Sequence, residues 1–115
     1  MASLKISTLV AAAVVAFGVL GPNTSRADET GLAGMHKWVK VGKKTCFEGH
    51  EHYGSSAGMR DKKSATAEAI KSWSGFTAFE YGTTWANFNK AHKKRISCTQ
   101  GSGGWGCEIE AIPCK

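Results

Sequence analysis

The sequence predicts an α+β fold: a small single domain in the order strand–helix–strand–strand, with one helix packed on a mostly antiparallel three-stranded sheet and stabilised by disulfides. Three observations predict it. Apolar residues recur at helical spacing over residues 62–80. Two β-type runs flank a glycine-rich turn near the end of the chain. Four cysteines, an even number, follow a secretory-type N-terminal segment, a combination typical of small disulfide-bonded domains.

Residues 1–27 have the pattern of a signal peptide. Lys5 precedes an apolar run over residues 6–20, and small residues lead to a predicted cleavage site after Ala27. The run is shorter than the about 20 residues that a membrane-spanning helix needs, so a signal is preferred to an anchor. We therefore expect a secreted or periplasmic protein without a transmembrane segment after cleavage.

Cleavage at that site would leave a short, mildly basic chain. Removing 27 of 115 residues leaves 88, and a chain of this size buries a modest core that disulfides of roughly 2–4 kcal/mol each would support. Removing Lys5 and Arg26 from fifteen basic residues leaves thirteen against nine acidic ones, a net charge of +4. That balance permits weak association with anionic surfaces, and together with the expected location outside the cytoplasm it argues against nucleic acid as a partner.

The mature chain is expected to begin with a flexible arm or linker over residues 28–44, followed by a disulfide-bonded domain over residues 45–115. Within the arm, residues 35–42 alternate briefly, as an edge strand does, and Trp38 is expected to pack on the domain. Residues 46–53 predict the first strand, because their side chains alternate between two faces.

The helix is predicted over residues 62–80, with Asp61 or Ser64 as its N-cap and Gly82 at its C-terminal end. Residues 83–98 fit two patterns. A long, bent strand entered after Trp85, with a bulge near Ala91, is favoured, and a short helix over residues 83–92 is the alternative. The expected core consists of five apolar side chains: Trp73, Phe76, Phe88, Ile96 and Ile109.

A turn at Ser102–Gly103 sets the register of the C-terminal hairpin. It predicts these cross-strand pairs: Gln100–Trp105, Cys98–Cys107, Ile96–Ile109, Lys94–Ala111, Arg95–Glu110 and Ser97–Glu108. A cysteine pair, an apolar pair and an opposite-charge pair agree in this one register. It favours a Cys98–Cys107 disulfide and leaves Cys46–Cys114 by elimination, although four cysteines allow three connectivities.

Two histidines form the first candidate site. His50 and His52 are two residues apart, so they share a face of the predicted first strand, where they could bind Zn²⁺ or Cu²⁺ with His92 as a third ligand. The competing interpretation is a solvated strand face on which Glu48 or Glu51 pairs with the histidines. No other cofactor is expected.

The second candidate is a basic binding surface. Its predicted members are Lys90, Lys93, Lys94, Arg95 and Trp105. Basic residues interleaved with aromatic ones bind anionic polymers, whereas lysines on a strand edge also protect that edge from unwanted pairing.

No serine, histidine and carboxylate set stands out as an active site, and no Cys-x-x-Cys redox motif is present. We therefore expect a non-enzymatic binding or interaction domain of unknown specificity. Its partner would be an envelope or extracellular protein or an anionic polymer. Metal binding and polyanion binding through the two candidate sites are the alternatives.

Four short motifs carry a resemblance. They are His-x-His-Tyr-Gly at 50–54, Ala-Ile-x-x-Trp at 69–73, Tyr-Gly-x-x-Trp at 81–85, and Cys98 followed by Trp-x-Cys and Ala-x-Pro-Cys within 105–114. Together they resemble small secreted or periplasmic cysteine-containing bacterial proteins of unassigned function. The resemblance implies an envelope or secreted location and no catalytic residues.

Overall fold

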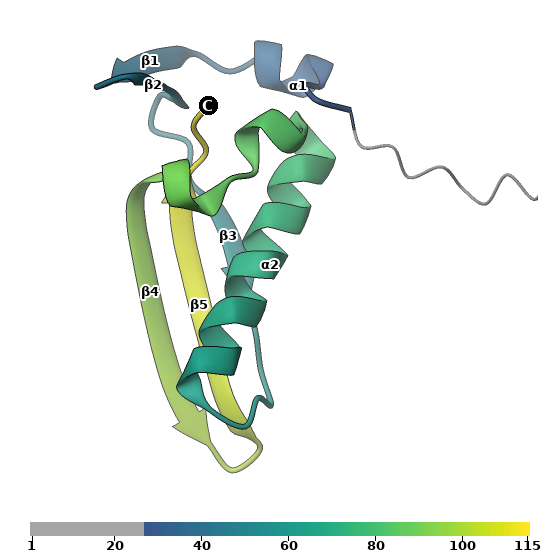
Figure 1. The fold of residues 1–115 in the computed structure, drawn as a ribbon, viewed down its shortest axis with the longest axis vertical. Helices are drawn as coiled ribbons and strands as arrows, with labels where there is room; N and C mark the ends of the chain where they lie inside the picture. The colour runs from purple at the N-terminus through teal and green to yellow at the C-terminus, as the bar shows by residue number, and fades with distance from the viewer. Residues whose placement is uncertain (1–26) are drawn as a thin grey trace, which may run out of the picture.

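The structure, a computed structural model, describes residues 27–115, so the predicted signal segment lies outside the described residues except for Ala27. The described chain forms one long helix, a three-stranded sheet and a separate two-stranded hairpin (Figure 1). The elements are α1 (Gly31–Gly34), β1 (Trp38–Val41), β2 (Lys44–Phe47), β3 (His52–Ser55), α2 (Lys62–Tyr81), the 3-10 helices η1 (Thr83–Trp85) and η2 (Phe88–Lys90), β4 (His92–Gly101) and β5 (Gly104–Ile112). The predicted α+β class is confirmed.

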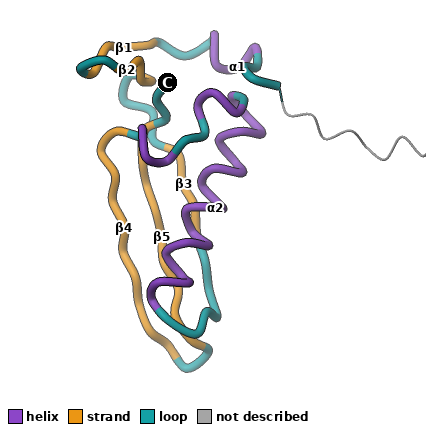
Figure 2. Tube along the Cα trace, viewed as in Figure 1, coloured by secondary structure: helices purple, strands orange, loops and turns teal. Residues whose placement is uncertain are grey.

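The three-stranded sheet has the antiparallel order β3-β5-β4, and α2 covers β3 and β5 (Figure 2). Helix α2 begins where the Asp61 carboxylate accepts a hydrogen bond of 2.7 Å from the Ser64 N–H, and it ends at Gly82, whose φ of 103° suits glycine. Its bounds and its cap match the sequence prediction. No helix among residues 27–115 has the length and apolar content to cross a membrane.

Gly54 lets helix and sheet meet at close range. A Cβ atom at this position would lie 2.4 Å from the backbone oxygen of Ala69 and 2.5 Å from the backbone nitrogen of Trp73. The Trp73 indole N–H donates to the carbonyls of His52 at 3.0 Å and Ala111 at 3.3 Å, one on each of two neighbouring strands. The helix is therefore fixed to β3 and β5 beside the one position of β3 that has no side chain.

Three of the five predicted core residues, Trp73, Phe88 and Ile109, are buried. The prediction was wrong for Phe76 and Ile96, which are 60% and 47% exposed. Helix α2 packs mainly on β3 and β5, so Ile96 on the edge strand β4 is only partly covered. Phe76 precedes the buried Thr77 by one residue, so its side chain lies on the flank of α2 and not between helix and sheet.

Strands β4 and β5 pair in the predicted register from Gly101–Gly104 to Arg95–Glu110. The predicted Lys94–Ala111 pair was wrong. The register shifts between His92 and Arg95, where Lys93 adopts a φ of 52°. This irregularity has the character of a β-bulge and gives the edge strand a local bend.

Between α2 and β4 the chain forms η1 and η2, so neither the favoured strand after Trp85 nor the alternative single helix over residues 83–92 is correct. The Asn87 side chain starts η2 by accepting a hydrogen bond of 3.0 Å from the Asn89 N–H. Asparagine supports such local turns at the expense of longer regular structure. The expected bulge lies at Lys93, two residues beyond Ala91.

The predicted first strand over residues 46–53 is in fact two strands. Strand β2 pairs with β1, whereas β3 pairs with β5, and residues 48–51 connect them. Gly49 in this connection has a φ of 62°, a conformation that ends a strand. Cys46 and His52 therefore belong to different sheets.

Both predicted disulfides, Cys98–Cys107 and Cys46–Cys114, are present. The second joins β2 to the end of the chain, where Thr45 and Lys115 also exchange backbone hydrogen bonds of 2.9 and 2.8 Å. The β1–β2 hairpin is therefore attached to the sheet through the residues that follow β5.

The segment before β1 packs against the end of α2. The Thr30 N–H donates to the Tyr81 carbonyl at 3.0 Å, and Ala33 of α1 is fully buried. The ring centroids of Trp38 and Trp85 are 5.1 Å apart. Strand β1 therefore packs on the buried cluster that contains Ala33, Tyr81 and Trp85. The flexibility expected for residues 28–44 stays a prediction, while the segment supplies α1 and β1 to the fold.

The close helix–strand contact predicts opposite effects for two glycine-to-alanine substitutions. We expect Gly54→Ala to destabilise the protein by about 1–3 kcal/mol, because two backbone atoms of α2 block the new methyl group. Gly75 lies in α2, and nothing lies within 4 Å of the place where its Cβ would be. Gly75→Ala should therefore stabilise the protein by about 0.5–1 kcal/mol. Urea unfolding of both variants measures the difference, and equal effects would refute the contact.

Candidate functional site

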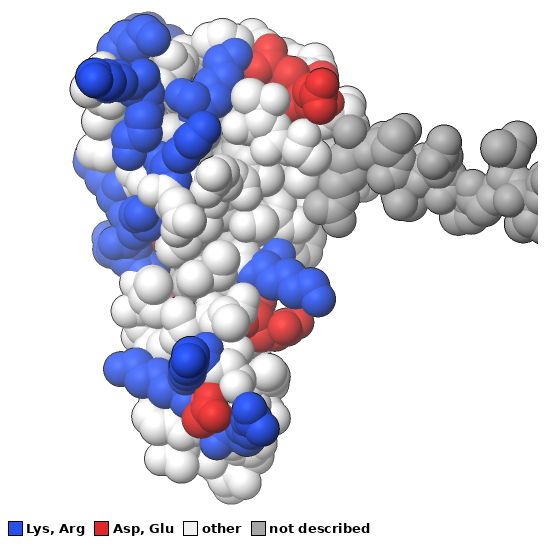
Figure 3. Space-filling view, in the orientation of Figure 1, with Lys and Arg blue, Asp and Glu red and all other residues white. Residues whose placement is uncertain are grey.

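Lysine side chains gather where the β1–β2 hairpin lies beside the start of β4. Figure 3 shows basic side chains over these elements along one edge of the molecule. We use the term basic surface for the six lysines of the hairpin, of the start of β4 and of η2, which leads into β4: Lys40, Lys43, Lys44, Lys90, Lys93 and Lys94. All are exposed except Lys44, which is half-buried. They come from three segments of the chain: the hairpin, η2 and β4.

The chain end brings these segments together. Strand β2 pairs with it at Thr45–Lys115, and β4 pairs with it at His92–Ile112. Ile112 and Lys115 are three residues apart, so β2 and the first residues of β4 attach to almost the same stretch of backbone. The arrangement therefore depends on pairing between residues distant in sequence.

The basic surface keeps its positive charge. Among the described residues, no carboxylate lies within 4.0 Å of any of its six amino groups. Lys94 is held in place by donating to the Asn89 carbonyl at 3.1 Å and by lying 5.5 Å from the centre of the Phe88 ring. Neighbouring Lys37, in contrast, pairs with Glu48 at 3.3 Å and contributes less free charge.

The structure brings together only part of the predicted binding surface. Arg95 is bound by the carboxylates of Glu51 and Glu110, which offset its charge. The pairing with these carboxylates also raises the pKa of Arg95. Trp105 lies at the other end of the hairpin, where it pairs with Met59 through backbone hydrogen bonds of 2.7 and 2.9 Å. Its half-buried ring packs against the core, away from the lysines.

Sequence reasoning missed the three lysines of the β1–β2 hairpin. A sequence signal for this hairpin was present in residues 37–45, Lys-Trp-Val-Lys-Val-Gly-Lys-Lys-Thr. In this run Gly42, a turn residue, follows a short strand-like alternation of side chains. Gly42 has a φ of 60°, as many hairpin turns require. Treating residues 28–44 as an arm concealed this hairpin.

Three of the four histidines form a second cluster beside the end of α2. The rings of His36 and His50 stack with their centroids 4.3 Å apart. His50 Nε2 lies 2.7 Å from the Tyr81 hydroxyl, and His52 Nε2 lies 2.9 Å from a carboxylate oxygen of Glu80. We call these five residues the histidine cluster.

The histidine cluster shifts the titration of several of its members. Burial lowers the pKa of His50, and the nearby His36 and His52 lower it further. The hydrogen bond from His52 lowers the pKa of Glu80. Burial, together with neighbouring Glu80, raises the pKa of Tyr81 to about 12. The cluster therefore favours a neutral His50 beside an ionised Glu80.

The predicted position of His50 and His52 on one strand face was wrong. His50 precedes β3 in the connection from β2, and the two rings are 6.4 Å apart. His92 belongs to β4, where it pairs with Ile112 of β5. In the described part of the chain, its ring packs on neither the His50 ring nor the His52 ring. Within residues 27–115, no three His, Cys, Asp or Glu side chains form a group that could hold a metal ion. Binding of Zn²⁺ or Cu²⁺ by these histidines stays a prediction, which calorimetry tests.

Comparisons with protein-family models, with curated proteins and with solved structures find no match for this chain.

The lowered pKa of His50 predicts acid sensitivity of the fold. A histidine whose pKa is lower in the folded state than its ordinary value of about 6.5 binds protons more readily when unfolded. Its contribution to stability is therefore complete above that ordinary value and is lost as the pH falls through the folded-state pKa. Stability measured by urea unfolding should decline below about pH 6.5, and His50→Gln should flatten this decline.

The control for this experiment is His92→Gln, since His92 lies outside the histidine cluster. It should leave the dependence of unfolding on pH as in the parent protein. An unchanged profile for His50→Gln would show that the stacked pair does not control acid sensitivity.

Proposed function

We propose that this protein is a secreted or periplasmic, non-enzymatic interaction domain that binds an anionic polymer or the anionic surface of an envelope component. One observation carries the proposal: six lysines from three chain segments form one surface whose amino groups have no carboxylate partner within 4.0 Å among the described residues. A partner with several negative charges can bind several of them at once.

The expected binding is electrostatic and depends on salt. Each amino group that neutralises a charge on a polyanion releases condensed counterions, so affinity falls as salt concentration rises. Charges separated by more than about 8 Å are largely screened at physiological ionic strength, which favours partners that touch the surface directly. The proposal therefore predicts short-range binding to a closely spaced anionic partner.

The scaffold supports a preformed surface. The Cys46–Cys114 disulfide and the Thr45–Lys115 backbone pair fix the hairpin, and the Lys94 contacts fix the start of β4. A surface that is already ordered loses less conformational entropy on binding than a flexible lysine-rich tail would lose.

The signal-type sequence and the disulfides support the proposed location. Disulfides persist in the periplasm and outside the cell and are rare in reducing compartments. Both cysteine pairs are bonded and no described cysteine is free. A basic domain in such a compartment would meet the anionic polymers and lipid headgroups of the envelope.

Removing the hairpin lysines should weaken binding to heparin, a soluble anionic polymer used as the probe. We expect Lys40→Gln/Lys43→Gln/Lys44→Gln to elute from heparin at lower salt, with the slope of log affinity against log salt reduced by about 2–3. The matched control is Lys62→Gln/Lys63→Gln/Lys71→Gln, which removes the same charge from exposed positions of α2.

Two outcomes would contradict the proposal. If both triple variants lose affinity equally, net charge governs binding and the basic surface has no special role. If the parent protein fails to bind heparin or vesicles containing an anionic phospholipid at low salt, the surface does not bind polyanions.

A further inference from the structure

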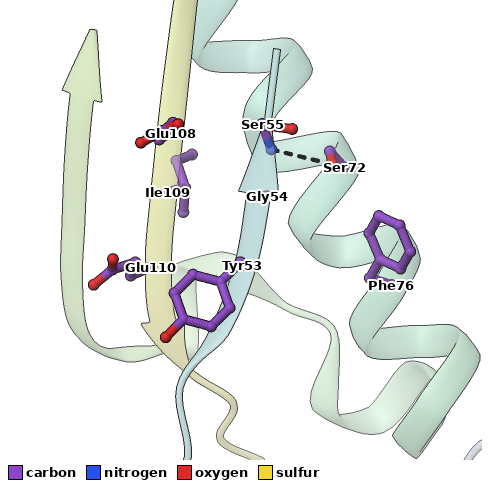
Figure 4. A pocket seen from close by; sticks show the side chains of 8 residues that line it. All are labelled: Tyr53, Gly54, Ser55, Ser72, Phe76, Glu108, Ile109 and Glu110. Carbon is purple, nitrogen blue, oxygen red and sulfur yellow. Dashed lines mark hydrogen bonds between the residues drawn. The ribbon is translucent and has the colours of Figure 1, made fainter.

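A hollow lies on the opposite side of β5 from β4, where β3 and α2 meet (Figure 4). Its volume is about 290 Å³. Its lining residues include two aromatic ones, two acidic ones and two serines: Tyr53, Phe76, Glu108, Glu110, Ser55 and Ser72. We refer to it as the Tyr53 hollow. The lysines of the basic surface are not among its lining residues.

Two aromatic rings at the Tyr53 hollow are open to solvent. Tyr53 and Phe76 are each 60% exposed, and neither ring pairs with another aromatic ring among the described residues. Between them lies Gly54, which has no side chain because α2 passes directly against it. The backbone of α2 fills the place of a side chain at Gly54, so no side chain of β3 stands between the two rings.

The carboxylates of the hollow are not equivalent. Glu110 is bound by Arg95, which also contacts Glu51. Glu108 is exposed and has no cationic group within 4.0 Å among the described residues. In the sheet register it is paired with Ser55 on β3 and Ser97 on β4, and neither of these two residues carries a charge.

We propose that the Tyr53 hollow binds an organic cation, a guanidinium or ammonium group with an apolar stem. The face of an aromatic ring attracts cations through its quadrupole, and Glu108 supplies an opposite charge that no side chain of the described protein neutralises. The stem of such a ligand would pack on Tyr53 and Phe76. The hollow is thus a second site, with the opposite charge preference to the basic surface.

The size of the hollow fits one such group. Small-molecule sites commonly have volumes of about 300–1,000 Å³, so this hollow is at the lower limit and suits a side-chain-sized ligand. Its open geometry and single free carboxylate predict weak binding, in the millimolar range, since exposed cation–π contacts and ion pairs each contribute little.

Amide chemical-shift titration of the ¹⁵N-labelled protein tests the proposal. The probes are N-acetyl-argininamide, which represents a peptide side chain, and choline, which represents a free small cation. Each has a neutral analogue of nearly the same shape, N-acetyl-citrullinamide and 3,3-dimethyl-1-butanol. We expect at least one cation to shift residues around β3 and β5, and its neutral analogue to bind about threefold or more weakly.

Substitutions locate the binding. Tyr53→Leu and Glu108→Gln should each weaken binding of that cation by about threefold or more. The matched controls are Phe79→Leu, an exposed aromatic of the same helix as Phe76, and Glu68→Gln, an exposed carboxylate of α2. Both controls should leave the affinity unchanged.

Three results would overturn the proposal: no shift with either cation, equal binding of a cation and its neutral analogue, or equal losses in the site and control variants. Equal binding would instead indicate a hydrophobic or hydroxyl-binding surface. Failure here leaves heparin binding untouched, because none of these substitutions alters a lysine.

Discussion

The link between β2 and the end of the chain holds the β1–β2 hairpin on the three-stranded sheet. The Cys46–Cys114 disulfide joins residues 68 positions apart, and the backbone pair at Thr45–Lys115 lies beside it. Closing a loop of this length restricts the unfolded chain by an amount equivalent to roughly 4 kcal/mol. The link also buries Phe47 against Trp85, whose rings stack with centroids 4.2 Å apart. It thereby joins the hairpin, the end of α2 and the sheet into one body.

The fold could be predicted where local signals agreed with one another. The β4–β5 register followed from cysteine, apolar and charge pairs that all required the same turn, and the bounds of α2 followed from Asp61 and Gly82. Prediction failed where one residue changed the course of the chain. Gly49 divides the expected first strand, and the bulge at Lys93 displaces the last pairs of the hairpin. Such glycine and bulge positions do not alter the hydrophobic pattern from which strands are inferred.

The candidate sites were less predictable, because they are assembled by long-range pairing. The lysines of β4 were found as a run, but the hairpin lysines joined them only through the chain end. The ring that stacks on His50 is that of His36, fourteen residues earlier, which the sequence pattern did not indicate. At Glu108 the register was correctly predicted, yet the sequence did not show that Tyr53 would lie on the same hollow. Local patterns thus predicted neighbours within one element, and tertiary contacts decided which elements share a surface.

Two groups of lysines, separated in sequence by more than forty residues, are proposed to act as one surface. Lysine acetylation followed by mass spectrometry, with and without heparin at low salt, measures whether they do. We expect protection of Lys40, Lys43 and Lys44 together with Lys90, Lys93 and Lys94 at the same heparin concentration, while Lys62, Lys63 and Lys71 of α2 stay reactive. Protection of only one group, or equal protection of the α2 lysines, would contradict it.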